Sequence, residues 1–392
     1  MQIATPIEIS PSPIHRVKIV RQKHIPVLDG VRAIAVLLVM IFHFFQHGPV
    51  QTNAVLKAVG RASALGQMGV DLFFVLSGFL ITGILLDTRH KEHALKTFYL
   101  RRTFRIFPLY YSYLIVAFLL LPALHMATPV AWTDQWWFWF YCQNIQDTFL
   151  EKFTMFGPGH FWSLAVEEHF YLIWPFIVLR LPLRHLKHVL LSLIGLALLV
   201  RAVMVAAGYP VYYFTLCRIG TLALGALLAV LSRQGNFLQV AGHWLQKYTL
   251  WFLAVLVPFY ALLTGASNPI VQVVKFSLFA LVCATVLVLS LTASRGDIPA
   301  RILGSSTASA IAKGSYAMYV FHPAIFDLLR VKLPALPTVV ALPIAFLATF
   351  TAAWLSWHLL ENPCLKLRDW VQGRNERDPL IPAALPNAYY KR

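Results

Sequence analysis

Long apolar stretches recur along the chain, and they set the first expectation about its fold. A membrane-spanning helix needs about 20 largely apolar residues. Ten stretches of this kind lie at 31–47, 69–86, 107–124, 164–181, 189–207, 211–231, 248–264, 269–292, 315–329 and 336–359. The pattern predicts an all-α, polytopic transmembrane helical bundle of about ten spans. Glu361 and Pro363 follow the last stretch, and we expect the proline to end that helix.

The stretch 131–146 has a different pattern, because it is aromatic, short and flanked by polar residues. Trp and Tyr favour the headgroup region of a bilayer, so we expect an interfacial or re-entrant segment there. Residues 1–24 and 369–392 are polar and basic. We therefore expect one membrane domain, 25–368, between two cytoplasmic tails. The first tail lacks the apolar region of a signal peptide.

The composition agrees with a membrane location. Hydrophobic residues make up 58% of the chain and charged residues only 12%, whereas a soluble domain carries about 25% charged residues. The net charge of +17 would suggest nucleic acid as a partner of a soluble protein, but the chain contains no nucleic-acid-binding motif. Lys and Arg gather on the cytoplasmic side of membrane proteins, which accounts for the charge.

The distribution of Lys and Arg predicts the orientation. With the N-terminal tail inside, 24 of the 33 Lys and Arg residues fall in cytoplasmic segments and seven fall on the outer side. Arg32 and Arg218 lie within spans and complete the count. Because cytoplasmic loops carry the excess of positive charge, we expect both termini in the cytoplasm.

The first span contains two polar residues, Arg32 and His43. They are eleven residues apart, which returns them to nearly one helix face about 16 Å apart along the axis. A charged group at mid-membrane costs about 2.5–3.5 kcal/mol, and a neutral imidazole is the usual general base near pH 7. The alternatives are an interfacial anchor for Arg32 and a packing residue for His43. His43 and His47 could share a metal ion, but no third ligand is evident, and we expect no metal site.

Polar residues also mark the second span and the segment that precedes the third. Asp71 lies near the outer end of the second span and Ser77 in its middle; a carboxylate stabilised by the helix dipole is the alternative for Asp71. Arg102 and Arg105 are three residues apart, on one face of a helix start. Paired guanidinium groups suit a phosphate or a carboxylate, although cytoplasmic charge alone also explains them.

The segment 157–175 brings two acids, Glu167 and Glu168, into a span. Two acids inside a membrane are costly, so a purely structural role is the weaker explanation. Ser163, Glu167 and Trp174 share one face of the predicted helix. Further candidates for substrate contact or for support of the site are Ser77, Trp162, Ser163, Tyr171, Arg218 and His322, although Arg218 and His322 could equally be partners of other buried polar groups.

In combination, these segments resemble the acyltransferase 3 family of bacterial membrane enzymes. The segments are LDGVRAIAVLLVMIFHF, GVDLFFVLSGFLITGILL, RRTFR, FWSLAVEEHFYLIWP, SYAMYVFHP and the closing ENP. The resemblance covers about residues 25–368. It implies catalytic roles for His43, Glu167 and Asp71, with His43 as the base, and donor-binding roles for Arg32, Arg102 and Arg105.

The resemblance implies an O-acyltransferase of a bacterial inner membrane. Enzymes of the family acylate surface polysaccharides, O-antigen sugars, lipochitooligosaccharides, peptidoglycan and some macrolides. The donor would be acyl-coenzyme A, most simply acetyl-coenzyme A, and no cofactor would be bound permanently. Unlike some two-part relatives, this sequence has no hydrolase-like domain after the last span. We therefore expect transfer to be completed within the membrane domain or handed to a partner.

Two other kinds of protein fit the composition. A transporter or flippase of a glycan or lipid-linked substrate could use buried charges to line a path, but the chain shows no internal repeat. A catalytically inactive membrane scaffold is the second alternative. Under the enzyme hypothesis, helix rise predicts that His43, Asp71 and Glu167 fall near one level of the outer half. Arg102 and Arg105 would then lie about 15–20 Å away, towards the cytoplasm.

Overall fold

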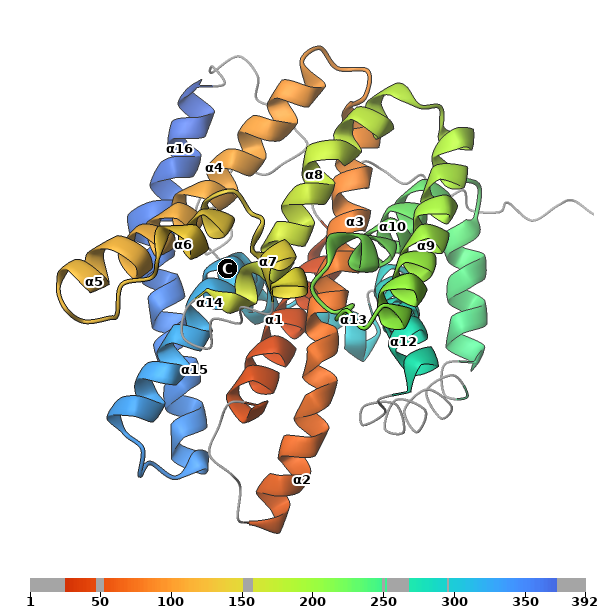
Figure 1. Ribbon diagram of the computed structural model, residues 1–392. Helices are drawn as coiled ribbons and strands as arrows, with labels where there is room; N and C mark the ends of the chain where they lie inside the picture. The colour runs from red at the N-terminus through yellow and green to blue at the C-terminus, as the bar shows by residue number, and fades with distance from the viewer. Residues whose placement is uncertain are drawn as a thin grey trace, which may run out of the picture. The chain divides into compact units, whose positions relative to one another are not determined.

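The computed structural model describes residues 25–46, 53–150, 158–248, 251, 268–294 and 296–371. Every regular element in these ranges is helical, which confirms the expected all-α class (Figure 1). In chain order the elements are α1 (Pro26–Gln46), α2 (Ala54–Ala62), η1 (Ser63–Gln67), α3 (Met68–Thr88), α4 (Ala94–Ile115), η2 (Val116–Leu120), α5 (Leu121–Ala123), α6 (Trp132–Trp139), α7 (Gln143–Phe149), η3 (Gly159–Phe161), α8 (Trp162–Arg180), α9 (Leu183–Ala206), α10 (Thr215–Leu231), α12 (Pro269–Thr292), α13 (Ile298–Leu303), α14 (Ser306–Lys332), α15 (Thr338–Ser356), η4 (Trp357–Glu361) and α16 (Asn362–Val371).

Six of the described helical segments are long and apolar enough to cross a bilayer. They are Pro26–Gln46, Ala54–Thr88, Ala94–Ala123, Leu183–Ala206, Pro269–Thr292 and Thr338–Val371, and α10 is a shorter apolar helix. This is the architecture of a polytopic helical membrane protein. The count of about ten spans stays a prediction. One expected span, 248–264, lies almost wholly outside the described residues.

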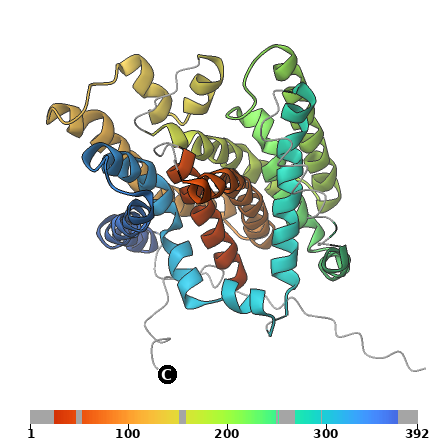
Figure 2. The ribbon, with the colours of Figure 1, turned by 90° about the horizontal axis from the view of Figure 1, so that it is seen from below.

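Helix α1 lies at the centre of the bundle, which places its polar residues deep among other helices (Figure 2). It packs against α3, α12, α13 and α14. One face of α1 is apolar and buried, with Val36, Val39 and Met40 at most 1% exposed. That spacing follows the helical repeat, which brings residues three and four apart to one face.

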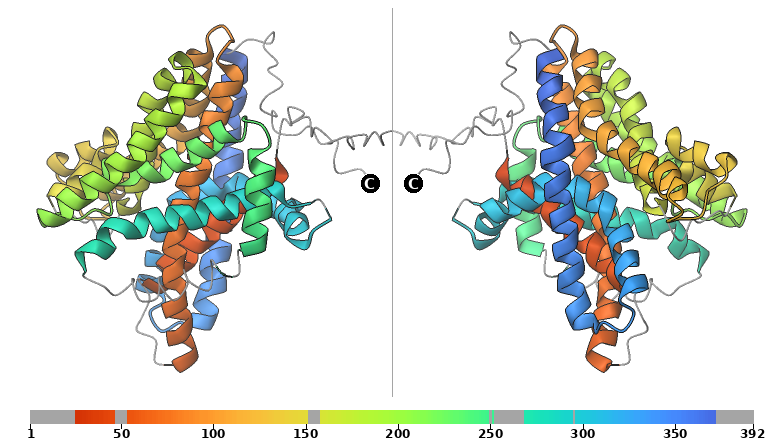
Figure 3. Two further views of the ribbon diagram at one scale, coloured as in Figure 1. Left: turned by 90° about the vertical axis from the view of Figure 1, so that its right-hand side faces the viewer. Right: turned by 90° about the vertical axis from the view of Figure 1, so that its left-hand side faces the viewer.

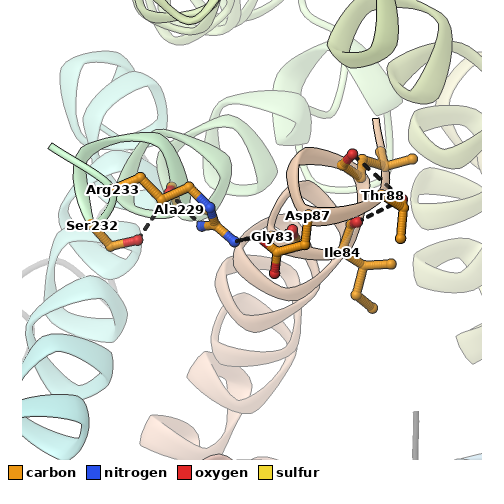
Figure 4. Close-up of polar contacts among 8 residues, drawn as sticks. Gly83, Ile84, Asp87, Thr88, Ala229, Ser232 and Arg233 are labelled. Atoms are coloured by element: carbon orange, nitrogen blue, oxygen red, sulfur yellow. Dashed lines mark hydrogen bonds and ion pairs between the residues drawn. The ribbon is translucent and has the colours of Figure 1, made fainter. Parts of the chain in front are cut away.

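Helices α3 and α10 approach closely because each presents a glycine to the backbone of the other. A Cβ atom on Gly78 would lie 2.0 Å from the carbonyl oxygen of Leu222, and one on Gly225 would lie 1.9 Å from that of Val75. Small residues allow this approach in membrane helix pairs. At the ends of the two helices, Arg233 donates to the Gly83 carbonyl and to the Asp87 carboxylate, at 3.0 and 2.8 Å (Figure 4).

The aromatic stretch 131–146 folds as two short helices, α6 and α7, and not as a span. Two tyrosine hydroxyls of α4 are hydrogen-bonded to α6. Tyr110 donates to the Phe138 carbonyl at 2.7 Å, and Tyr111 donates to the Trp139 carbonyl at 3.1 Å. Trp132, at the start of α6, is 65% exposed. The segment therefore presents aromatic surface outward while it packs against the bundle.

The expectation that Pro363 ends the last span is wrong. Helices α15 and α16 continue as one long rod (Figure 3). The turn between them, η4, is a π turn, in which the Asn362 N–H bonds to the Trp357 carbonyl five residues back. A proline lacks the N–H that an ordinary helical turn would use, and the wider turn carries the chain past this position.

Candidate functional site

His43 of α1 and His322 of α14 meet across the helix pair. Nδ1 of His43 lies 2.7 Å from Nε2 of His322, and the two rings are nearly parallel, with centroids 5.0 Å apart. Nδ1 of His322 lies 3.0 Å from the Met318 carbonyl oxygen, so in the neutral ring this nitrogen carries the proton and Nε2 accepts. His43 then donates from Nδ1. Its Nε2 is left unprotonated, which is the form that a general base needs.

A third histidine, His160, completes this cluster, although it was not among the residues predicted from the sequence. Its ring centroid lies 5.4 Å from that of His322. The His160 carbonyl accepts from the Tyr319 hydroxyl at 2.7 Å, and Tyr319 also bonds to the Ser163 hydroxyl. Burial and the nearby His43 lower the pKa of His160 to about 3, so its ring stays neutral at physiological pH. The feature of the sequence that could have indicated His160 is its position just before a span that contains two acids.

Ser77 of α3 is hydrogen-bonded by two residues of α8. Its hydroxyl donates to Oε1 of Glu167 at 2.6 Å and lies 2.6 Å from the Tyr171 hydroxyl. Since the Ser77 proton goes to Glu167, Tyr171 donates to the Ser77 oxygen. The guanidinium carbon of Arg102, from α4, lies 3.6 Å from the centre of the Tyr171 ring. These four residues bring a hydroxyl, a carboxylate, a phenol and a cation into one cluster.

The two arginines of α4 have different surroundings. Arg102 stacks on Tyr171, whereas Arg105 donates to Oε2 of the buried Glu361 at 3.0 Å and to the Lys313 carbonyl at 3.2 Å. Glu361 also accepts from Ser356. Arg105 thus ties α4 to α14 and to the π turn, and its charge is already paired. Arg32 lies close enough to both arginines to interact with them electrostatically.

Asp71 lies in a separate cluster with Arg218 of α10. Oδ1 of Asp71 accepts from Nη2 of Arg218 at 2.7 Å, and both side chains are 1% exposed. Aromatic rings surround the guanidinium, the nearest being that of Phe276 at 4.1 Å and the farthest that of Trp162 at 5.8 Å. Breaking a buried ion pair by removing one partner leaves an unpaired charge. This pair therefore fixes how α3 packs on α10.

The structure brings most of the sequence-predicted residues together in three groups. One contains His43 and His322, the second contains Ser77, Glu167, Tyr171 and Arg102, and the third contains Asp71, Arg218 and the ring of Trp162. None of the hydrogen bonds described for His43 joins it to Asp71 or Glu167. The Ser163–Tyr319 bond lies between the first two groups, because Ser163 precedes Glu167 by one turn and Tyr319 precedes His322 by one turn.

The predicted separation of about 15–20 Å between the arginine pair and the outer site is wrong for Arg102 and Glu167. Arg102 stacks on Tyr171, and Tyr171 lies one turn along α8 from Glu167. Counting helix rise ignored the length of an arginine side chain and the tilt of the helices. His47, which could have shared a metal ion with His43, lies outside the described residues.

A family model described as an acyltransferase domain matches residues 25–358. The "Peptidoglycan O-acetyltransferase OatA" of Listeria monocytogenes is 29% identical over 381 residues, which is 88% of this chain and 56% of that protein. A Staphylococcus aureus protein named "Putative O-acetyltransferase" is 27% identical over 395 residues, 92% of this chain and 60% of its own length. No solved structure matches the chain.

The chain spans only about 60% of the length of these curated relatives, so the comparison concerns one domain. The family match nevertheless covers most of the chain and includes all three groups of polar residues. It agrees with the motifs of the sequence and with the helical membrane architecture. The chain belongs to the acyltransferase 3 family and contains its acyltransferase domain.

Proposed function

We propose that this protein is a membrane-embedded O-acyltransferase. It moves an acyl group, in the simplest case acetyl, from acyl-coenzyme A to a hydroxyl of a carbohydrate acceptor such as a cell-surface polysaccharide, a lipopolysaccharide or a glycoconjugate. It works in a bacterial inner membrane with both termini in the cytoplasm. The names of the relatives, which specify O-acetyl transfer and in one case peptidoglycan, support this choice of reaction.

The observation that carries the proposal is the His43–His322 pair. A hydroxyl attacks an acyl carbonyl efficiently only if a base removes its proton, and the base must have a free lone pair at the right nitrogen. The bond from His322 to the Met318 carbonyl fixes the tautomers of both rings. His322 thus orients the base, as a third group does in a catalytic triad.

The proton and the acyl group move as follows. Nε2 of His43 takes the proton of the acceptor hydroxyl while the oxygen attacks the acyl carbonyl. The bond between the carbonyl carbon and its leaving group breaks, and an ester forms on the acceptor. Over the whole reaction coenzyme A departs as a thiolate. The resulting imidazolium then releases its proton to the thiolate or to water, which restores the base.

The donor is held by positive charge next to Ser77 and Glu167. Arg32 and Arg102 lie near the Glu167 cluster, and a guanidinium that stacks on a ring keeps its in-plane N–H groups available for an anion. Arg105 contributes less directly, because Glu361 already pairs with it. The phosphates and the pantetheine arm of acyl-coenzyme A are the ligands that this arrangement suits.

The test is acyl transfer by the purified full-length protein in lipid nanodiscs. We expect radiolabelled acetyl-coenzyme A to lose its acetyl group to an added glycan acceptor, with one free thiol released for each acetyl transferred. His43→Ala should lower turnover about 10²–10⁴-fold, the usual contribution of a positioned base. His188→Ala is the matched control, since His188 is an exposed helical histidine bonded to the Arg184 carbonyl.

Two results would contradict the proposal. If well-folded His43→Ala protein transferred acetyl at the normal rate, His43 would have no part in the chemistry. If the protein moved a labelled glycan across a vesicle membrane without acylating it, the protein would be a transporter.

A further inference from the structure

Two groups in this membrane domain have the geometry of proton-transfer sites, yet a single direct transfer needs only one. The first is the His43–His322 pair on α1 and α14. The second is the Ser77–Glu167 pair on α3 and α8, where a hydroxyl donates to a carboxylate at 2.6 Å. Ser77 and Glu167 are both partly buried.

The second group has the parts of an activated nucleophile. A serine attacks a carbonyl when a base lies within hydrogen-bond reach and a further group holds the pair in place. Glu167 is the base, and Tyr171 bonds to the Ser77 oxygen from the other side at 2.6 Å. Arg102, stacked on Tyr171, places a permanent cation near the point where negative charge would develop on an attacked carbonyl.

Helix α8 explains why these groups meet. Ser163, Glu167 and Tyr171 are four residues apart, so they form one polar stripe along the helix. At one end of the stripe, Ser163 bonds to Tyr319 of α14. At the other end, Glu167 and Tyr171 bond to Ser77 of α3. Each of the two proton-transfer sites is therefore about one helical turn, roughly 5 Å along an axis, from the Ser163–Tyr319 bond. An acceptor hydroxyl between α8 and α14 would be near both.

We propose that Ser77 carries the acyl group as a covalent ester between donor and acceptor. This rests on the proposed function, since it takes an acyl thioester as donor. In the first half-reaction Ser77 attacks the thioester carbonyl, its proton passes to Glu167, the carbon–sulfur bond breaks and coenzyme A leaves as a thiolate.

In the second half-reaction the acceptor hydroxyl attacks the Ser77 ester and gives its proton to His43. The ester bond to Ser77 breaks, and Glu167 returns its proton to the serine oxygen. The sum is one ester formed, one thioester broken and one proton released from His43. The two groups of residues thus serve the two halves of one reaction.

The experiment measures the first half-reaction alone. Full-length protein in nanodiscs is incubated with acetyl-coenzyme A and tritiated coenzyme A, without any acceptor. A covalent intermediate allows label to enter acetyl-coenzyme A by reversal of the first step. We expect wild type and His43→Ala to exchange label. We expect Ser77→Ala to exchange it at least about 10²-fold more slowly than wild type. Ser290→Ala is the control, because Ser290 is a buried helical serine bonded to the Val286 carbonyl.

The intermediate is also trapped chemically. After a brief reaction with ¹⁴C-acetyl-coenzyme A and an acid quench, label should remain on the peptide that contains Ser77 and resist neutral hydroxylamine, as an oxygen ester does. In Ser77→Cys the label should become sensitive to hydroxylamine, because the adduct is then a thioester. This variant keeps a nucleophile of similar size, so its result does not depend on the tolerance of the site to alanine.

Three results overturn the inference while the proposed function stands: wild-type transfer to an acceptor without exchange, full exchange in Ser77→Ala, or label on His43. A protein that neither transfers acetyl nor exchanges coenzyme A with any acyl-coenzyme A contradicts the proposed function itself. The two failures are therefore distinguishable in one set of assays.

Discussion

Glu167 and Glu168 are adjacent in sequence, but only Glu167 is hydrogen-bonded to Ser77. Adjacent helical residues point about 100° apart, so the two carboxylates face different neighbours. We predict that Glu167→Gln lowers acetyl turnover about 10²-fold or more, because an amide cannot take the serine proton. Glu168→Gln, the matched control, should lose less than about tenfold. Turnover of both variants at saturating donor checks this, and a more damaging Glu168→Gln would show that the wrong acid was chosen.

Asp147 of α7 gives a prediction about pH. Burial raises the pKa of its carboxyl to about 7 from its ordinary value of 3.8. Between these values the folded protein holds a proton that the unfolded chain has lost. The protonated Asp147 carboxyl therefore makes its full contribution to the free energy of unfolding below pH 3.8. This contribution decreases as pH rises towards 7, by up to about 1.4 kcal/mol per pH unit.

Thermal unfolding of the protein in nanodiscs at pH 5 and pH 8 tests this. Asp147→Asn, which has no charge to bury, should be the more stable protein at pH 8 and should lose most of this advantage at pH 5. The exposed Glu92, 89% accessible at its side chain, supplies Glu92→Gln as a control that should follow wild type. If Asp147→Asn showed the same difference in unfolding temperature between pH 5 and pH 8 as wild type, another titrating group would be responsible.

At the residue scale, the sequence indicated which positions were unusual but not which residues they contact. Polar residues in apolar spans singled out His43, Asp71 and Glu167. Their partners are distant along the chain: His322 is 279 residues from His43, and Arg218 is 147 residues from Asp71. Such pairings depend on which helices become neighbours, and periodicity within one helix carries no information about that.

At the scale of elements, the glycine contact between α3 and α10 gives a sharp test. A methyl group at Gly78 or Gly225 would overlap a carbonyl oxygen of the partner helix, at 2.0 and 1.9 Å. Because that oxygen is backbone, a helix must move. We predict that Gly78→Ala and Gly225→Ala each destabilise the folded protein by about 1–3 kcal/mol or more, the cost of overpacking.

The measurement is the thermal unfolding midpoint of each purified variant, with yield of monodisperse protein as a second reading. Gly195→Ala is the matched control, since a Cβ atom at this helical position meets nothing within 4 Å and alanine favours a helix. Unchanged stability of both test variants would show that α3 and α10 separate more easily than their contact indicates.

Hydropathy located the apolar part of each helix better than its ends. The expected span 69–86 matches α3, Met68–Thr88, and 164–181 matches α8, Trp162–Arg180. Helix α4, however, begins at Ala94, although its apolar stretch begins at 107. The arginine-rich first half is helical too, because Arg and Lys are good helix formers, and a hydropathy window does not register it.

At the scale of the whole molecule, the excess of Lys and Arg predicts both termini inside. A fluorescent protein fused to the C-terminus should therefore fluoresce in intact bacterial cells, and alkaline phosphatase fused there should be inactive. The reverse is expected for fusions that end at Met126, in the connection after α5, which the same rule places outside. Cells that express each fusion provide the readings. Active phosphatase at the C-terminus would contradict the predicted cytoplasmic location of that terminus.

The buried pair of Asp71 and Arg218 has a consequence for how the protein is made. The two residues are 147 positions apart, and a ribosome adds about 5–20 residues per second. Asp71 is therefore synthesised roughly 7–30 seconds before Arg218, with which it forms its buried ion pair. During that interval α3 brings an unpaired carboxyl towards the lipid, at a cost of about 2.5–3.5 kcal/mol if it is charged. Helix α3 can take its final place only after α10 has entered the membrane. Folding of the first half of the chain is therefore completed only after part of the second half has been inserted.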